Sequence, residues 1–568
     1  MKTSGNGIVV SVGTAQLRYC ILLAFTAAAF AVSQPPVSRT APSYEPYAYV
    51  VHQGTPAWSP DDREIFYSVF HTRKTAGHLY RVPASGGTGR RVFPKDPWSA
   101  AAEWSPDGKR IVFAWEDAGG KHIWTANRRG NDLRQVSHGA EGFDLSPSWS
   151  HDGKMIAWTS LKDEAAAAIM VAGADGSSAK KFAAGYRPRF SPNGQSIAYT
   201  AAVPKLAGEP FWAVYIKDLA GGEPRPLKST RGAMKAWPSG TDWSPDGHQI
   251  VFVRHLQAGS ELLLVNVESD TIARTIHLDG TAHDPAWSHD GKRIAFMLQT
   301  TEHAGEIHTV QLDLEKTTTV THQRHYGPGK LISYPSADGA SVFAYLFEPS
   351  GRQYSVRAGL IWVHGGEPGT GSADDTFHGD IQYFVDQGFS VIAPDFHPGN
   401  EVADLSAAAR FLSERAGVPP ARISLVGFSF GGFLSLLTAA RSEGSFAAIV
   451  DFFGPTDLAD LYQDARQYRA VIIRRVGGTP QEKPEQYREL SPVSLAARIK
   501  PPVLILHGTA DPLIPIRHSV RMAEALKAAN KEVRFMTFDS GHGFSVEDDL
   551  KAFPEAASFL LSHLPSRN

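Results

Sequence analysis

Short apolar strands separated by polar turns form the recurring pattern of the first half of the chain. Apolar and polar residues alternate over residues 110–115, 155–159, 249–253 and 293–297, which is the period of a half-buried β-strand. A second apolar run often follows, as at residues 122–126. We therefore expect antiparallel strands joined by tight turns throughout this half.

One turn phrase precedes these strands six times: an aromatic residue followed by Ser-Pro-Asp-Gly or a close variant. Pro presets φ, Asp bonds neighbouring backbone amides and Gly accepts positive φ, so the phrase is typical of a turn. We assign its aromatic residue to packing between repeats. The copies are Trp58-Ser-Pro-Asp-Asp62, Trp104-Ser-Pro-Asp-Gly108, Trp149-Ser-His-Asp-Gly153, Phe190-Ser-Pro-Asn-Gly194, Trp243-Ser-Pro-Asp-Gly247 and Trp287-Ser-His-Asp-Gly291.

The spacing of these copies predicts an all-β propeller over residues 48–325. Their first residues lie 41–53 positions apart, which matches the four-stranded blade of a propeller rather than a shorter helical or leucine-rich repeat. Six blades are recognisable. A seventh, degenerate blade would fit between Phe190 and Trp243 or would be completed by residues 44–57, so the count stays open between six and seven.

The second half of the chain alternates strand-like and helix-like segments. Near Tyr326-Gly-Pro-Gly329 the repeat ends, and we place the domain boundary there, with a second domain over residues 326–568. Apolar strand-like runs separated by helical patterns predict a largely parallel α/β sheet. These runs are residues 358–363, 390–393, 422–426, 447–450, 502–506 and 533–536.

A candidate nucleophile follows the run that ends at Val426. The phrase Gly427-Phe-Ser429-Phe-Gly431-Gly432 precedes a helix-compatible segment at residues 433–440. Gly-x-Ser-x-Gly alone is a weak signal, but between a strand and a helix it is the nucleophile elbow of an α/β-hydrolase. Glycines are needed there because other side chains would collide with the neighbouring strand and helix. Ser429 is therefore the predicted nucleophile.

A base and a carboxylate follow Ser429 in the chain order of this fold. Asp511 lies after the run at residues 502–506, and His542 lies in Gly541-His-Gly543 after the last run. Because the carboxyl ends of parallel strands meet at one edge of a sheet, we predict a Ser429, Asp511, His542 catalytic triad there. Such a triad requires no metal or organic cofactor.

Two backbone amides are predicted to form the oxyanion hole of this site. The first is the amide of Phe430, the residue after the nucleophile. The second is assigned to Gly366 in His364-Gly-Gly366, which follows the run at residues 358–363. We expect His364 itself to be structural.

Composition narrows the class of protein. The 568 residues exceed what one core usually organises, and 42% hydrophobic and 20% charged residues with 52 Gly and 38 Pro are typical of globular domains rich in turns. A formal net charge of −2, with no run of Lys and Arg, makes nucleic acid a poor partner.

The N-terminus predicts export. Lys2 and Arg18 precede an apolar stretch at residues 20–32, and small residues suit cleavage before Gln34. We interpret residues 1–33 as a signal peptide and residues 34–47 as a linker, with the mature protein periplasmic or secreted. The stretch is shorter than a spanning helix needs, so we expect no stable membrane anchor after cleavage. Cys20 is the single cysteine, so the mature chain would contain no disulfide or thiolate metal site.

The motifs together resemble the prolyl oligopeptidase family of serine peptidases, in the style of acylaminoacyl peptidases and dipeptidyl aminopeptidases, preceded by a TolB-like propeller. The matching phrases are Gly427-Phe-Ser-Phe-Gly-Gly432, Ser491-Pro492, Lys500-Pro-Pro-Val-Leu-Ile-Leu-His-Gly508, Asp511 with Pro515, and Gly541-His-Gly-Phe544. The resemblance implies cleavage of short peptides, because the propeller of this family roofs the active site and excludes folded proteins.

Two departures from the family pattern bear on substrate preference. Phe396-His-Pro-Gly-Asn-Glu401 stands where members often carry Arg-Gly-Ser-x-Gly-Tyr-Gly, so the pocket wall differs. No phrase matches the paired propeller glutamates with which dipeptidyl peptidases bind a substrate amino terminus. Asp163-Glu164 is an adjacent acid pair in a blade loop, and most such pairs are simply solvated.

The hypothesis from sequence is thus an exported serine peptidase. An exported esterase with the same triad is the nearest alternative, because fold does not select the chemistry. A propeller binding protein with an inactive hydrolase domain is the other. The residue preference, the choice between exo and endo cleavage and the oligomeric state stay open.

Overall fold

The protein consists of two compact units, seen in a computed structural model. One lies within Val51–Gln299 and Gly305–Gln323, and the other within Thr300–Ala304 and Arg324–Asn568. The residues that the structure describes are 52–71, 76–93, 99–117, 120–138, 142–161, 167–203, 211–231, 239–256, 259–302, 305–322, 327, 329–349, 357–366, 378–442, 446–465 and 468–566. The predicted signal peptide and linker, Tyr326 and Asp163-Glu164 lie outside them.

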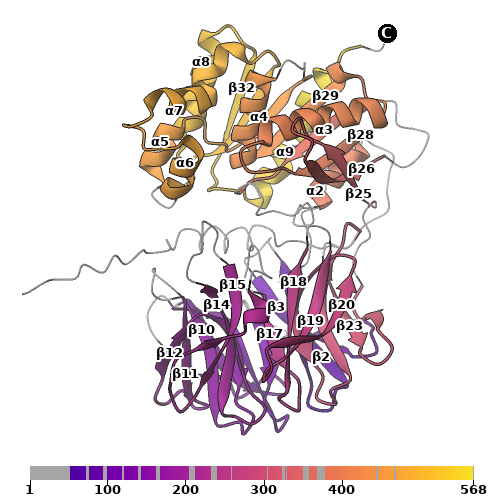
Figure 1. Cartoon of the computed structure of the whole chain (residues 1–568), viewed down its shortest axis with the longest axis vertical. Helices are drawn as coiled ribbons and strands as arrows, with labels where there is room; N and C mark the ends of the chain where they lie inside the picture. Colours follow the sequence, from indigo (N-terminus) through magenta and orange to yellow (C-terminus); the bar gives the residue numbers. More distant parts are fainter. Residues whose placement is uncertain are drawn as a thin grey trace, which may run out of the picture. The chain divides into compact units, whose positions relative to one another are not determined.

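The first unit is a β-propeller in which almost all neighbouring strands are antiparallel (Figure 1). Its strands are β1 His52–Trp58, β2 Glu64–His71, β3 Ala76–Pro83, β4 Arg90–Arg91, β5 Ser99–Trp104, β6 Arg110–Asp117, β7 Gly120–Asn127, β8 Arg134–Gln135, β9 Gly142–Trp149, β10 Met155–Ser160, β11 Ala168–Gly173, β12 Lys180–Ala184, β13 Tyr186–Phe190, β14 Ser196–Val203, β15 Phe211–Asp218, β16 Arg225–Pro226, β17 Thr241–Trp243, β18 Gln249–His255, β19 Ser260–Asn266, β20 Thr271–Leu278, β21 Thr281–Trp287, β22 Arg293–Gln299, β23 Glu306–Gln311 and β24 Lys316–Thr319.

The described strands form four separate four-stranded sheets, not six, so the predicted count of separate blades is wrong. These four sheets are β1–β4, β13–β16, β17–β20 and β21–β24. The remaining strands, β5–β12, form one eight-stranded sheet that carries two of the turn phrases. The reason is a parallel pairing of β7 with β9, at Gly120 with Gly142 and at Lys121 with Phe143, which joins two repeats side by side.

The repeated phrase forms the turn that its residues predict. In the second copy the Ser105 hydroxyl donates to Asp107 Oδ1 at 2.7 Å and accepts from the Arg110 amide at 2.9 Å. Gly108 has φ +67. The aromatic residues of all six copies are buried. Trp58 packs with Ala286 of the last sheet, whose carbonyl accepts from its indole N–H at 3.0 Å, so the first and last repeats are in contact.

A bulge recurs on the first strand of five of the six repeats, three residues before the aromatic position. In each of these repeats the residue at the bulge is not glycine, yet its φ lies between +48 and +54, in the left-handed region. Neighbouring hydroxyls stabilise it, as Ser68 Oγ does by accepting from the Ala101 amide at 2.8 Å. The five residues are Thr55, Ala101, Ser146, Arg187 and Asp284.

The second unit is an eight-stranded sheet in the order β25-β26-β28-β27-β29-β30-β31-β32, parallel from β28 to β32. Its strands are β25 Lys330–Pro335, β26 Ser341–Phe347, β27 Ala358–Val363, β28 Phe389–Asp395, β29 Ile423–Phe428, β30 Ile449–Phe452, β31 Val503–Gly508 and β32 Val533–Phe538. Its α-helices are α2 His378–Asp386, α3 Glu401–Arg415, α4 Phe430–Arg441, α5 Leu458–Asp464, α6 Arg469–Val476, α7 Pro484–Leu490, α8 Arg517–Ala528 and α9 Val546–Ser562.

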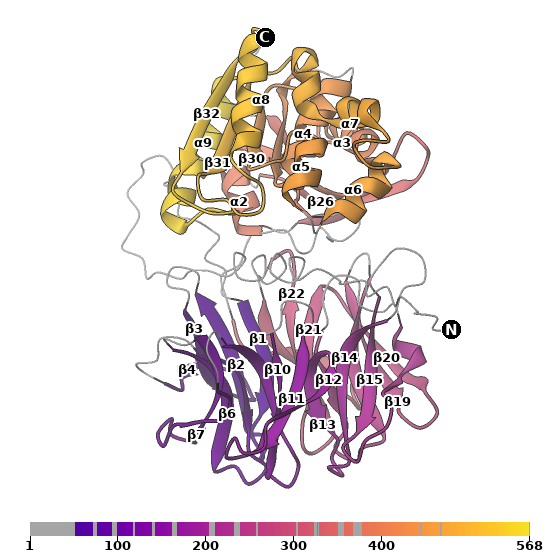
Figure 2. The ribbon, with the colours of Figure 1, turned by 90° about the vertical axis from the view of Figure 1, so that its left-hand side faces the viewer.

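Helices cover both faces of this sheet (Figure 2). On one face Ile361 and Val363 of β27 share a core with α3, α4 and α8, and on the other Leu360 and Trp362 share a core with α2 and α9. Because successive side chains of a strand point to opposite faces, a strand covered on both sides is a continuous apolar run. Among the described residues no helix is both long and apolar enough to span a membrane.

Candidate active site

Ser429 occupies a strained turn between β29 and α4. Its backbone has φ +52 and ψ −120, a conformation that a residue with a side chain rarely adopts. The turn is held because the Ser429 amide donates to the carbonyl of Phe452 at 2.8 Å and the Gly432 amide donates to the carbonyl of Ser429 at 2.9 Å. The structure thus contains the sharp strand-to-helix turn of a nucleophile elbow.

Three glycines around Ser429 are required by close packing. A Cβ on Gly427 would overlap the carbonyl oxygen of Gly431, and a Cβ on Gly431 would overlap the carbonyl oxygen of Val363. A Cβ on Gly432 would overlap Oδ1 of Asp451. The steric reason for Gly at these positions, inferred from the sequence, therefore holds in the structure.

The structure brings the three predicted triad residues together. His542 Nε2 lies 3.0 Å from Ser429 Oγ, and His542 Nδ1 lies 2.7 Å from Asp511 Oδ2. Asp511 follows β31 and His542 follows β32, and all three side chains are buried. The carboxylate therefore accepts from Nδ1–H, which leaves the lone pair of Nε2 facing the serine hydroxyl.

Asp511 is held by four donors. Its Oδ1 accepts from the amides of Leu513 and Ile514, each at 2.9 Å. Its Oδ2 faces His542 and, at 3.4 Å, Nε2 of His507. Burial alone would raise the pKa of Asp511, but the hydrogen bonds from His507 and His542 outweigh it and hold the pKa far below its ordinary value. The carboxylate is thus ionised throughout the physiological range.

The first predicted oxyanion donor, Phe430, belongs to the elbow, and the second, Gly366, follows the segment that packs against it. Phe430 is the first residue of α4, so its amide belongs to the free N–H groups of the helix N-terminus. Gly366 has φ +86 and follows β27. The preceding segment packs on the elbow, since a Cβ on Gly431 would also overlap the carbonyl oxygen of His364. His364 stacks on Phe396 at 4.4 Å between ring centroids, and burial lowers its pKa.

The segment that departs from the family pattern is anchored by buried carboxylates. The His397 amide donates to Asp404 Oδ2 at 2.7 Å, and the Gly399 amide donates to Glu401 Oε1 at 3.1 Å. Asp404 and Glu401 belong to α3 and are buried. This part of the predicted pocket wall therefore rests on α3.

Sequence reasoning missed Arg475 of α6, which reaches the elbow. Its guanidinium makes two bonds to Glu401, at 2.8 and 2.9 Å, and lies 4.9 Å from the ring centroid of Phe430. Such a cation over an aromatic ring stabilises the ring position. Glu401 and Arg475 are 74 residues apart, so no local pattern in the sequence indicates the pair. Among the described residues no group of three or more His, Cys, Asp and Glu is arranged to hold a metal.

Comparison with known families assigns both halves of the chain. A model described as the prolyl oligopeptidase family matches residues 396–567, and a TolB β-propeller domain model matches residues 50–201 and 183–345. An uncharacterized peptidase, YtmA, of Bacillus subtilis is 33% identical over 210 residues, which cover 35% of this chain and 79% of the relative. The chain belongs to the prolyl oligopeptidase family.

Other members of this family extend the likeness to the propeller. Dipeptidyl-peptidase 5 of Porphyromonas gingivalis is 21% identical over 498 residues, 77% of this chain and 64% of the relative. The crystal structure of Pyrococcus horikoshii acylaminoacyl peptidase has a TM-score of 0.66 at 16% identity, over 91% of this chain and 97% of that chain. The prolyl oligopeptidase assignment makes this protein a serine-type peptidase with an N-terminal β-propeller.

Proposed function

We propose that the protein hydrolyses short peptides by acyl transfer through Ser429. The observation that carries this proposal is the hydrogen-bonded chain from Ser429 through His542 to Asp511, built on a left-handed elbow. Each group has the neighbour that its role needs: a base for the hydroxyl proton and a carboxylate for the imidazolium.

The proposed reaction has two halves that use the same groups. Ser429 Oγ attacks the substrate carbonyl while His542 Nε2 takes its proton, and the carbonyl electron pair moves to oxygen, where the amides of Phe430 and Gly366 donate hydrogen bonds. Collapse of this intermediate breaks the C–N bond as His542 gives the proton to the leaving amine. Water then attacks the acyl-enzyme by the same route and frees Ser429.

The proposed substrates are short because the family architecture places a propeller before the catalytic domain, and this chain has both parts. The names of two similar proteins, a dipeptidyl-peptidase and an acylaminoacyl peptidase, fit removal of small units from peptides. A length series of peptide amides tests this. We expect kcat/KM to fall steeply for unfolded protein substrates, and equal rates for casein and short peptides would contradict the restriction.

Peptidase and esterase activity are separated by paired substrates. An amide and an ester with the same acyl group are compared in wild type and in Ser429→Ala. We expect Ser429-dependent cleavage of the amide that exceeds the amide turnover of a simple esterase control. Ester turnover without amide turnover would favour an esterase. A folded protein that turns over neither would favour a propeller binding protein with an inactive hydrolase domain.

We also propose that residues 1–33 direct export to the periplasm or the medium. Support comes from the basic residues Lys2 and Arg18 before the apolar stretch at residues 20–32. N-terminal sequencing of protein from the native host tests the proposal. A mature chain that begins at Gln34 is expected, and a chain that retains residues 1–33 in the cytoplasm would contradict it.

A further inference from the structure

His507 is a fully buried histidine that the triad itself does not include. It lies on β31, four residues before Asp511, and both side chains have no exposed surface. We propose that His507 is a positioning residue for Asp511 and that the Ser519 hydroxyl orients the His507 ring. The inference rests on the proposed function, in which Asp511 is the triad carboxylate.

The partners of His507 determine which nitrogen carries the proton. Nε2 lies 2.8 Å from the carbonyl oxygen of Ile514 and 3.4 Å from Asp511 Oδ2. Both are acceptors, so Nε2 carries a proton, which it shares between a stronger hydrogen bond to Ile514 and a weaker, longer one to Asp511. Nδ1 lies 2.6 Å from the hydroxyl oxygen of Ser519, which donates to it in the neutral ring.

This proton completes the shell of donors around Asp511. Two backbone amides occupy Oδ1, and His542 and His507 share Oδ2. An ionised carboxylate offers about four acceptor positions, and these four donors occupy all of them. The carboxylate of Asp511 therefore cannot rotate without losing a hydrogen bond. His507 thereby fixes the orientation of the Asp511 carboxylate relative to His542. Its N–H also partly offsets the negative charge of Oδ2 next to His542.

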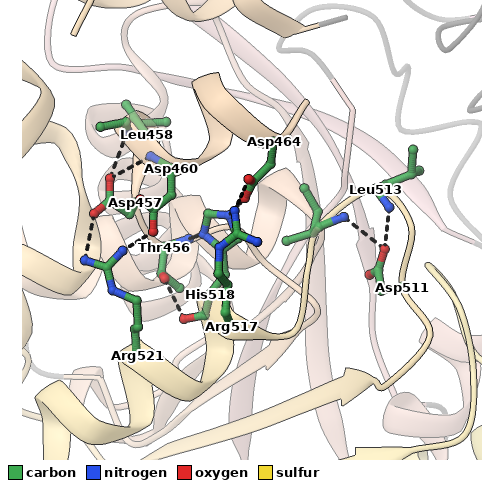
Figure 3. Close-up of polar contacts among 12 residues, drawn as sticks. Thr456, Asp457, Leu458, Asp460, Asp464, Asp511, Leu513, Arg517, His518 and Arg521 are labelled. Carbon is green, nitrogen blue, oxygen red and sulfur yellow. Dashed lines mark hydrogen bonds and ion pairs between the residues drawn. The ribbon is translucent and has the colours of Figure 1, made fainter. Parts of the chain in front are cut away.

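Ser519 belongs to α8, and Figure 3 shows the polar side chains that join α8 to α5 and its N-terminal cap. His518 has no exposed side-chain surface, and its carbonyl oxygen accepts from the Thr456 hydroxyl at 2.7 Å. Two arginines of α8 form ion pairs, Arg521 with Asp457 and Asp460, and Arg517 with Asp464. Nε2 of His518 lies 3.2 Å from Asp464 Oδ2. The hydroxyl that orients His507 therefore belongs to a rigid element.

Charged and titratable groups face His507 from three sides. Asp511 lies in the loop after β31, Asp451 lies on the adjacent strand β30, and His518 precedes Ser519 on α8. The variants below leave Asp451 and Asp511 in place, but His507 also lowers the pKa of Asp451, whereas Ser519→Ala keeps the His507 ring. A shift of the pH profile that the His507 and Ser519 variants share is therefore assigned to the His507–Ser519 unit.

The test measures kcat, KM and the pH profile of kcat/KM for a peptide amide in four variants. His507→Leu removes both ring nitrogens, His507→Gln keeps an amide donor, Ser519→Ala removes only the hydroxyl that orients the ring, and His518→Leu is the matched control. We expect His507→Leu to lower kcat by roughly 10-fold or more, as loss of a supporting partner does in metal sites, with KM little changed.

The acid-side midpoint of the profile should move to higher pH in His507→Leu. With fewer donors Asp511 is a stronger acceptor, which favours the protonated state of His542. Gln should restore part of kcat, Ser519→Ala should shift the profile in the same direction, and His518→Leu should lower the unfolding temperature without moving the midpoint. If His507→Leu does not fold, His507→Gln and Ser519→Ala carry the test.

Profiles of the His507 and Ser519 variants that superimpose on wild type would overturn the inference alone. Absence of Ser429-dependent hydrolysis in wild type would overturn the proposed function and the inference with it. A midpoint shift of the same size in His518→Leu would also overturn the inference, because it would assign the effect to the packing of α8.

Discussion

Asp451 on β30 is expected to make the catalytic domain less stable as the pH rises. The side chain is fully buried, its Oδ1 accepts from the Gly454 amide at 2.9 Å, and its Oδ2 has no hydrogen-bond partner among the residues that the structure describes. Burial raises the pKa of Asp451 from 3.8 to about 7, although His507 opposes the change. The folded protein thus keeps a proton that the unfolded chain releases.

The sign and size of the effect follow from this difference. Between pH 4 and pH 7 unfolding releases one proton from Asp451, so the contribution of Asp451 to the free energy of unfolding falls as the pH rises and levels off above pH 7. Each unit of pKa difference is worth about 1.4 kcal/mol, which gives a total of about 4 kcal/mol. The substitution Asp451→Asn removes the ionisable group and should remove this slope.

The prediction is tested by urea unfolding at pH 5 and pH 8, with pulsed hydrogen–deuterium exchange of peptides from β30 as a readout of this sheet. The stability advantage of Asp451→Asn over wild type should grow by about 3 kcal/mol between the two pH values. Asp404→Asn is the control, since Asp404 is equally buried but bonded to Ser336 and His397, and it should lower stability instead. An advantage of Asp451→Asn that is the same at pH 5 and pH 8 would refute the reasoning.

Three further predictions concern the same domain. Gly431→Ala should abolish fluorophosphonate labelling while the circular dichroism of the propeller persists, because the added methyl group overlaps the carbonyl oxygens of Val363 and His364. A variant that is still labelled would contradict the packing argument. Arg475→Ala should cost about 3–5 kcal/mol in thermal or urea unfolding because it leaves Glu401 buried and unpaired, and unchanged stability would refute it. Burial lowers the pKa of His518 to about 4, so the contribution of His518 to stability should fall as the pH drops from about 6.5 to 4, opposite in sign to that of Asp451. The free energy of unfolding of His518→Gln relative to wild type should therefore rise over that range, and a difference that does not change with pH would exclude this source.

Local patterns were sufficient to predict most elements of the catalytic domain. The apolar run at residues 358–363 is β27, and the Gly-x-Ser-x-Gly phrase lies between β29 and α4. Those elements are specified by neighbours in sequence: period, glycine and turn chemistry. The order of Ser429, Asp511 and His542 was informative for the same reason, since each follows a recognisable strand.

Features that depend on distant residues were not predicted. The pairing of β7 with β9 joins Gly120 and Gly142, and neither has a side chain whose pattern indicates a partner. The two-residue strands β4, β8 and β16 are too short to show a period. In the sequence His507 is part of an apolar strand pattern. Its contact with Ser519 of α8 exists only in the folded protein and cannot be inferred from either segment alone.

The central claim is that Ser429 is the nucleophile of a peptidase. The most direct measurement is mass mapping of the site modified by a fluorophosphonate in wild type and in Ser429→Ala, with hydrolysis of a peptide amide followed in the same samples. The account predicts one adduct, on the peptide that contains Ser429, with loss of hydrolysis in proportion to labelling and neither adduct nor hydrolysis in the variant. Hydrolysis that persists in Ser429→Ala, or an adduct on another residue that tracks the loss of activity, would contradict it.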